Sequence, residues 1–208
     1  MQSARDLVAG GGYQAVGMSA VAQHAGVGVG TVYRQFPSKA ELLAEVFRCA
    51  AQREVDAVVT AAGVRGSAAE RLCAAIETFA RRALAGRRLA WALIAEPVEP
   101  EIDAERLVFR RAFCEVFAGV LSDGIAAGEV RAQRVGLSAA ALVGAIGEAL
   151  AGPLAPIASP IDPDALVGEL VEFCLRSVTQ ETPQSRMARW SAGYQVPSEG
   201  GGRVGSQR

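Results

Sequence analysis

The sequence predicts an all-α protein of about nine helices, and two observations support this prediction. Almost every apolar stretch repeats at the three- and four-residue spacing of a helix face. No stretch shows the sustained alternation of apolar and polar residues that is typical of a half-buried strand. We expect two helical domains, residues 1–48 (the head) and residues 49–180 (the body). Residues 181–208 are rich in Pro, Ser, Gly and Arg and are expected to form a disordered tail.

Three short helices are predicted in the head. The first covers Ser3–Ala9 and ends at the run of glycines that starts at Gly10. The second and third cover Met18–Ala25 and Val29–Gln35 and are separated by a turn at Gly26. Two helices this short, joined by so tight a turn, are typical of a helix-turn-helix.

Several later helices begin at recognisable N-terminal residues. Ser38 with Glu41 is expected to form a capping box that starts a fourth helix, which runs to about residue 62. Ser67 with Glu70 repeats this pattern for a fifth helix. A ninth helix is expected from residue 162, because Pro163 then occupies the favoured first position. The sixth, seventh and eighth helices are expected at Leu89–Ala95, at Asp103–Ala127 and after Ser138.

Composition and charge favour a soluble protein. The apolar stretch Leu137–Ala158 approaches membrane-spanning length, but it contains Glu148 and two prolines and consists mainly of Ala and Gly. We therefore expect a buried helix and no membrane partner. Residues 1–16 lack the features of a signal peptide, so we expect a cytoplasmic location. The net charge is −1 overall but +1 over residues 1–50 and −4 over residues 51–180, which weakly favours nucleic-acid binding by the head.

The residue types needed for a metal site or for catalysis are sparse. Cys49, Cys73, Cys114 and Cys174 lie far apart, and His24 is the only histidine. We interpret the cysteines as small buried hydrophobic residues and the histidine as a surface or packing residue. The sequence contains no phosphate-binding glycine motif, nucleophile motif or metal-ligand cluster. We therefore expect no metal, no cofactor and no enzymatic activity.

The most informative segment is residues 12–39, GYQAVGMSAVAQHAGVGVGTVYRQFPSK. The core residues expected from its spacing are Val21, Ala22, Val27, Val32 and Phe36. Gly28 and Gly30 remove side-chain bulk near the start of the third helix, where backbone could approach a phosphate or a base edge. Thr31, Tyr33 and Arg34 form the kind of polar face that docking in a DNA groove requires.

This segment resembles the TetR family of bacterial transcriptional regulators in the order and spacing of its residues. The matching residues are Gly12, Tyr13, Val21, Ala22, Ala25, Gly26, Val27, Gly30, Thr31, Val32, Tyr33, Phe36 and Lys39. The resemblance implies that the third helix enters the major groove of double-stranded operator DNA. The residues that it places on phosphates are Thr31, Tyr33 and Lys39, and those near base edges are Val29, Gly30 and Arg34; Gln35 can also donate a hydrogen bond to a phosphate oxygen, without a charge. Gln35 stands where the family commonly has histidine.

The N-terminus leaves two interpretations open. Met1 aligns inside the family's first helix, so the basic arm that usually precedes this helix does not stand in residues 1–208: either the start is misassigned, or the chain has been trimmed, or anchoring in the minor groove has been lost. The first interpretation is a ligand-responsive DNA-binding regulator. The alternative is a TetR-like ligand-binding or interaction protein that lacks DNA binding because the arm is absent.

The resemblance also implies that the fifth to seventh helices enclose a pocket for a small apolar or amphipathic effector. The residues expected to line it are Phe79, Trp91, Phe109, Phe113 and Phe117, with Glu96 as a polar anchor. For any single one of these residues, a place in a plain hydrophobic core is an equally good interpretation.

The eighth and ninth helices are expected to form a homodimer interface, as a four-helix bundle with the same helices of a second subunit. The residues expected there are Ala140, Gly144, Gly147, Ala151, Leu166, Leu170 and Cys174. Packing against the fifth helix is the alternative for this face. A dimer of this kind would bind a palindromic operator with half-sites roughly 34 to 36 Å apart. We expect a repressor that its effector releases from DNA.

Overall fold

The computed structural model describes residues 1–13, 16–98, 100–157 and 161–179, and this part of the chain contains nine α-helices and no strand. The predicted all-α fold is therefore confirmed. The helices are α1 Gln2–Gly11, α2 Met18–Ala25, α3 Val29–Gln35, α4 Lys39–Ala62, α5 Ala68–Ala85, α6 Arg87–Ile94, α7 Pro100–Ala126, α8 Val135–Leu154 and α9 Pro163–Thr179. The tail predicted at residues 181–208 lies outside the described residues.

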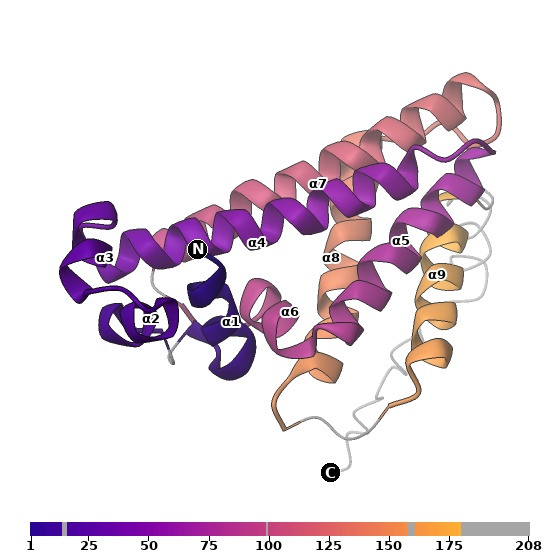
Figure 1. Cartoon of the computed structure of the whole chain (residues 1–208). Coiled ribbons are helices and arrows are strands. Elements are labelled where there is room, and N and C mark those ends of the chain that lie inside the picture. The colour runs from indigo at the N-terminus through magenta and orange to yellow at the C-terminus, as the bar shows by residue number, and fades with distance from the viewer. Residues whose placement is uncertain (14–15, 99, 158–160, 180–208) are drawn as a thin grey trace, which may run out of the picture.

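Two long helices, α4 and α7, lie side by side along the molecule (Figure 1). The three short helices α1, α2 and α3 gather at the end where α4 begins. In the body, α5 packs on α4 and α9, and α8 packs on α7. The small α6 contacts both α1 and α8, so it lies between the head and the rest of the body.

The head and the body share one hydrophobic core. Its buried residues form a single cluster that extends from Ala4 in α1 to Val178 in α9. The helix α4 continues without a break past residue 48, where the sequence predicted a domain boundary. That boundary therefore falls inside a helix rather than in a linker.

The predicted N-terminal caps of α4 and α5 form to different extents. Ser67 accepts a hydrogen bond from the amide of Glu70, and the Glu70 carboxylate accepts one from the Ser67 amide, so this capping box is complete. Ser38 accepts from the Glu41 amide at 3.1 Å, but within the described chain Glu41 makes no return bond. The capping box predicted at the start of α4 is therefore a single N-cap hydrogen bond, whereas the one at α5 is complete.

Helix α8 begins at Val135, three residues before Ser138, after which the sequence predicted its start. The Ser138 hydroxyl does not cap a helix; it donates to the Gln133 side chain at 2.7 Å. The α9 prediction was closer, because the Asp162 carboxylate accepts from the amides of Asp164 and Ala165 at the start of that helix.

The prediction of a buried eighth helix holds for one face only. Within the described chain, α8 is the one helix that passes a length and composition test for crossing a membrane, which a core helix of a soluble protein also passes. Its buried residues include Leu142, Ile146 and Leu150, whereas Leu137 on another face is 64% exposed. The exposed face of α8 is therefore available to a partner.

Candidate nucleic-acid interface and ligand cavity

Helix α3 presents nearly all of its side chains to solvent. Within it, Val32 alone is buried, at 6% exposure, and it anchors the helix to the core. The exposed residues are Val29, Gly30, Thr31, Tyr33, Arg34 and Gln35. Tyr33 is 51% exposed. All six α3 residues predicted to contact DNA therefore lie on an open surface.

Of the glycines around α3, Gly26 forms the turn before the helix, whereas Gly28 and Gly30 lie on the surface. Gly26 has φ +68° and ends α2 in the left-handed region, which favours glycine. A Cβ at Gly28 or Gly30 would have no neighbouring atom within 4 Å, so packing inside the chain does not require glycine there. Val27, predicted in the core, is 44% exposed because it follows the Gly26 turn and lies between the two helices.

Lys39, predicted to hold a phosphate, is exposed at the first residue of α4. Its neighbour Ser38 caps the helix, so a cation and the helix-start amides lie at the same place, which is a favourable arrangement for an anion. His24, near the end of α2, is also exposed, and its Nε2 lies 3.9 Å from the Asp6 carboxylate.

A carboxylate from the body holds the end of α1. Glu96, in the segment between α6 and α7, accepts a hydrogen bond from the Tyr13 amide at 3.3 Å. Its Oε1 atom would lie 2.7 Å from a Cβ at Gly12, so a side chain there would displace the Glu96 carboxylate, and the φ of +73° at this position favours glycine. Burial raises the pKa of Tyr13, and its ring stacks on Phe47 with centroids 6.3 Å apart. Glu96, predicted as a pocket anchor, therefore joins the body to the head.

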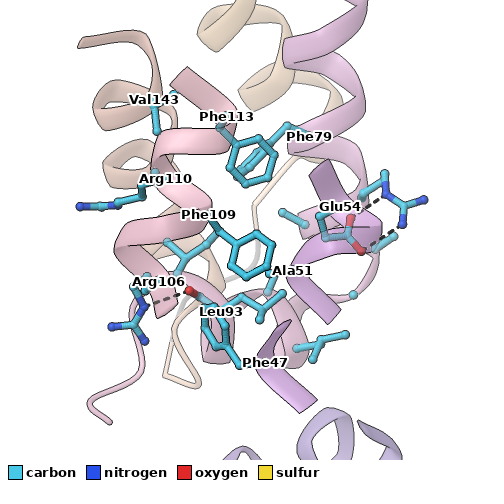
Figure 2. A pocket seen from close by; sticks show the side chains of 18 of the residues that line it. Phe47, Ala51, Glu54, Phe79, Leu93, Arg106, Phe109, Arg110, Phe113 and Val143 are labelled. Atoms are coloured by element: carbon cyan, nitrogen blue, oxygen red, sulfur yellow. Dashed lines mark hydrogen bonds and ion pairs between the residues drawn. The ribbon is translucent and has the colours of Figure 1, made fainter. Parts of the chain in front are cut away.

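A cavity of about 280 Å³ lies among α4, α5, α6, α7 and α8. Figure 2 shows Phe109 and Phe113 of α7 pointing toward Ala51 and Phe79 across it. The rings of Phe79 and Phe113 pack edge to face, with centroids 5.0 Å apart. The volume is near the lower end of the roughly 300 to 1,000 Å³ typical of ligand pockets, so the cavity suits a small or slender apolar group.

Charged side chains surround this apolar interior. Arg82 and Glu54 form a two-pronged ion pair at 2.6 and 3.0 Å. Arg106 donates to the backbone carbonyls of Leu93 and Glu96 and also pairs with Asp103. Both arginines thus have partners within the chain, as the dashed lines in Figure 2 show for Glu54 and for Arg106.

The cavity contains half of the predicted pocket residues. Phe79, Phe109 and Phe113 line it, whereas Trp91, Glu96 and Phe117 lie outside the lining. Phe117 is 1% exposed, so it belongs to the packed core beyond the cavity. The lining residues that the sequence prediction missed include Phe47 and Ala51 of α4, Leu93 of α6 and Arg5 of α1. The apolar positions of α4 could have indicated the first two; nothing in the sequence indicated Arg5.

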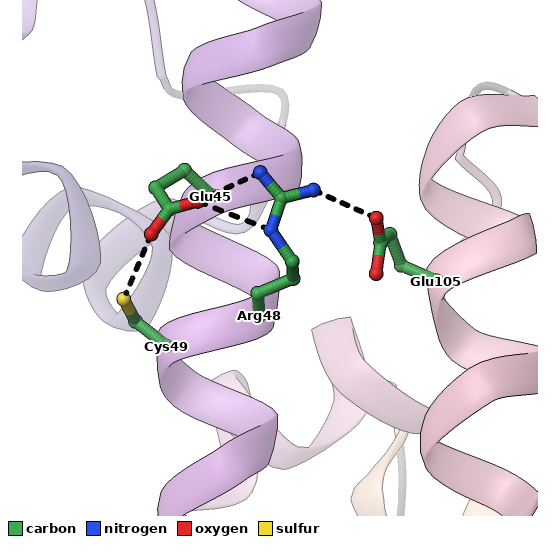
Figure 3. A network of polar contacts seen from close by, with 4 residues as sticks. All are labelled: Glu45, Arg48, Cys49 and Glu105. Carbon is green, nitrogen blue, oxygen red and sulfur yellow. Dashed lines mark hydrogen bonds and ion pairs between the residues drawn. The ribbon is translucent and has the colours of Figure 1, made fainter.

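A polar network joins α4 to α7 on the head side of the cavity. Arg48 of α4 donates to Glu45 on its own helix and, at 2.7 Å, to Glu105 of α7 (Figure 3). The Cys49 thiol donates to the other oxygen of Glu45 at 3.4 Å. Hydrogen bonds from Arg48, with a smaller contribution from Cys49, lower the pKa of Glu45. The network is a partly exposed ion-pair contact between the two long helices.

The residues predicted at the dimer interface divide into two groups. Ala140 and Gly144 of α8 are exposed, and Ala151 and Leu166 are partly exposed. Gly147 is buried and lines the cavity, while Leu170 and Cys174 are buried inside the chain, where α9 packs on α5. Leu137 of α8 and Phe173 of α9, at 64% and 60% exposure, were not predicted. The exposed residues of α8 and α9 therefore differ in part from the residues predicted at the dimer interface.

Family models match the head and a large part of the body. A model described as bacterial regulatory proteins, tetR family, matches residues 1–46. A second, described as tetracyclin repressor-like, C-terminal domain, matches residues 65–149. The two models together account for more than half of the chain.

Individual relatives agree with these models. The HTH-type transcriptional repressor KstR of Rhodococcus jostii (strain RHA1) is 62% identical over 37 residues, which are 18% of this chain and 18% of that protein. The match therefore spans less than a fifth of this curated relative. The fold resembles that of FadR from Bacillus subtilis in complex with stearoyl-CoA, at a TM-score of 0.72, 22% identity, and coverage of 83% of this chain and 94% of that one. It also resembles the fatty acid degradation regulator FadR from Bacillus halodurans, at a TM-score of 0.71, 20% identity, and coverage of 84% and 95%.

Proposed function

This chain belongs to the TetR family of bacterial regulatory proteins, and from that premise we propose that it is a ligand-responsive transcriptional repressor. The observation that carries the proposal is α3, a helix held by one buried valine and otherwise turned to solvent. The family is not a class of enzymes, and contact with chromosomal DNA implies a cytoplasmic protein.

The head supplies the DNA contacts. We assign Thr31, Tyr33, Gln35 and Lys39 to phosphates, because each has an exposed polar group able to donate a hydrogen bond. The residues assigned to base edges in the major groove are Val29, Gly30 and Arg34. The 37-residue match to KstR supports this DNA-binding interpretation over an interaction protein without DNA binding.

The cavity supplies the effector site. Its phenylalanine-rich lining favours an apolar or amphipathic effector. Because the FadR structure from Bacillus subtilis holds stearoyl-CoA, fatty acyl compounds are the first class to test. Effector binding would release DNA by favouring a subunit arrangement in which the two recognition helices no longer match one duplex.

A homodimer would present two copies of α3. The exposed α8 and α9 residues that would meet a second copy are Leu137, Ala140, Gly144, Leu166 and Phe173. Small residues on α8 allow the close approach of two helices, and Leu137 and Phe173 would bury apolar surface. The operator is then expected to be palindromic, with half-sites roughly 34 to 36 Å apart.

The test is DNA binding by the full-length chain, with footprinting on the DNA upstream of its own gene. Tyr33→Ala and Lys39→Ala should each weaken binding about tenfold or more, and Lys39→Ala should lower the slope of affinity against salt by about 1. Arg53→Ala removes an exposed charge of the same sign from α4 outside the head and should change neither quantity. Failure of the wild-type protein to protect any site would refute the proposal, and so would equal effects of Lys39→Ala and Arg53→Ala.

A further inference from the structure

The ligand cavity of the body includes a residue from the head. Arg5 of α1 is part of its lining, together with residues of α4 and α6. Helix α1 packs on both α4 and α6, and on α2 in the helix-turn-helix. A group bound beside Arg5 would therefore contact the head directly.

Arg5 has unused hydrogen-bonding capacity. Its Nε atom is shielded from solvent, and within the described chain it has no hydrogen-bond partner. A buried donor without a partner is unfavourable, and more so when the group is charged. An acceptor bound next to Nε would remove this penalty.

The other arginines of the lining are less suited to the same role. Arg82 is paired with Glu54, and Arg106 is engaged by backbone carbonyls and by Asp103. Arg110 is exposed, and Figure 2 shows its guanidinium pointing away from Phe109 and Phe113. Among the residues that the structure describes, Glu54 is the only carboxylate of the lining, and Arg82 neutralises it. Arg5 is thus the lining arginine with a shielded side-chain nitrogen, Nε, that has no partner among the described residues, while the residue as a whole is partly exposed.

We propose that Arg5 binds the anionic group of the effector, a carboxylate or a phosphate, so that the DNA-binding head forms part of the effector site. This inference rests on the proposed function and narrows its effector class to anionic amphipaths. The apolar part of the ligand lies among the phenylalanines, and the anion accepts hydrogen bonds from the Arg5 guanidinium. Binding thereby acts on α1 itself, in addition to any movement of α4 or α7.

The experiment measures binding of three probes to the full-length protein by calorimetry at pH 8. Decanoate carries a carboxylate, decanoyl-CoA carries phosphates but no free carboxylate, and 1-decanol is neutral. In the wild type we expect decanoate or decanoyl-CoA to bind more tightly than 1-decanol. Arg5→Gln should weaken the tighter anionic probe about tenfold, as expected for the loss of a charge-assisted hydrogen bond, and should change 1-decanol less than about threefold.

Three further variants make the result specific. Arg5→Lys keeps the positive charge but replaces the guanidinium with an ammonium group, so it should retain part of the preference for the anion. Arg88→Gln removes an exposed arginine of α6 that is not part of the lining, and it should have no effect on any probe. Arg110→Gln tests the lining arginine that is exposed to solvent. Thermal unfolding without ligand checks that each variant is folded.

A second measurement locates the effect in the head. Hydrogen exchange of the α1 amides should slow when the anionic probe binds to the wild type, and this slowing should be absent with 1-decanol. The proposal is overturned if Arg5→Gln weakens the binding of all three probes equally or of none of them. It is also overturned if Arg110→Gln, rather than Arg5→Gln, abolishes the preference for the anionic probe. It is also overturned if the wild type binds none of the probes, and DNA binding measured in parallel then shows separately whether the regulator proposal stands.

Discussion

The exposed face of α3 and the ligand cavity use their side chains in opposite ways. On α3, one residue in seven is buried, and the polar groups of Thr31, Tyr33 and Arg34 face solvent. Around the cavity, aromatic rings pack on one another, and Arg82 and Arg106 are held by partners within the chain. Substitutions on the exposed face of α3 should therefore alter binding with little effect on folding, whereas substitutions around the cavity should alter both.

The largest loss of stability is expected where the two regions meet. Phe47 is 1% exposed, stacks on Tyr13 of the head and lies 5.9 Å from the ring of Phe109 in the cavity. Phe47→Ala should lower the free energy of unfolding by about 3 to 5 kcal/mol, because it removes a large buried ring and leaves a void. Urea unfolding measures the change. Val59→Ala, at a half-exposed site on the same helix, should stay within about 0.5 kcal/mol of the wild type.

Two adjacent residues of α3 give the sharpest contrast. Val32→Ala should lower the free energy of unfolding by about 2 kcal/mol, because Val32 is the residue that anchors the helix. Tyr33→Ala should leave stability within about 0.5 kcal/mol, yet it should weaken DNA binding. Unfolding and DNA titration of both variants test this. Equal loss of stability in the two variants would show that α3 is not the open surface described above.

A smaller effect is expected at the start of α5. Ser67 caps this helix in a complete capping box, so Ser67→Ala should cost about 1 kcal/mol of stability. Ser122 is exposed on α7, and Ser122→Ala should have almost no effect. Thermal unfolding distinguishes the two variants, and DNA affinity at low temperature should be the same for both because the cap lies outside the head.

The smallest effect concerns pH. Arg48 lowers the pKa of Glu45 below its ordinary 4.5, so ionised Glu45 favours the folded state. This contribution is complete above the ordinary pKa and is lost as the pH falls through the lowered one. Glu45→Gln should cost less than about 1 kcal/mol at pH 7 and should flatten the acid side of the stability profile. Glu115→Gln, at an exposed site on α7, is the control, and an equal flattening there would contradict the assignment.

The head was predicted more accurately than the body because its signals are local. The bounds of α2 and α3 follow from Gly26, Gly28 and the short apolar pattern, and the structure confirms them. The cavity depends on contacts between distant residues. Glu96 joins Tyr13 across 83 positions, and helical spacing alone could not separate Phe117 in the core from Phe113 in the lining. The role of Arg5 depends on α1 packing against the body, which the pattern of α1 does not reveal.

The unbroken length of α4 has a mechanical consequence. At about 1.5 Å per residue, its 24 residues make a rod about 36 Å long. The first turn of α4 follows α3 in the chain. Phe47, Ala51 and Glu54 border the cavity about 12 to 23 Å farther along this helix. If the far end is held, a tilt of about 5° displaces the near end by about 3 Å. A tilt of this size at α4 would therefore shift its first turn by a distance comparable to the rise of one DNA base pair.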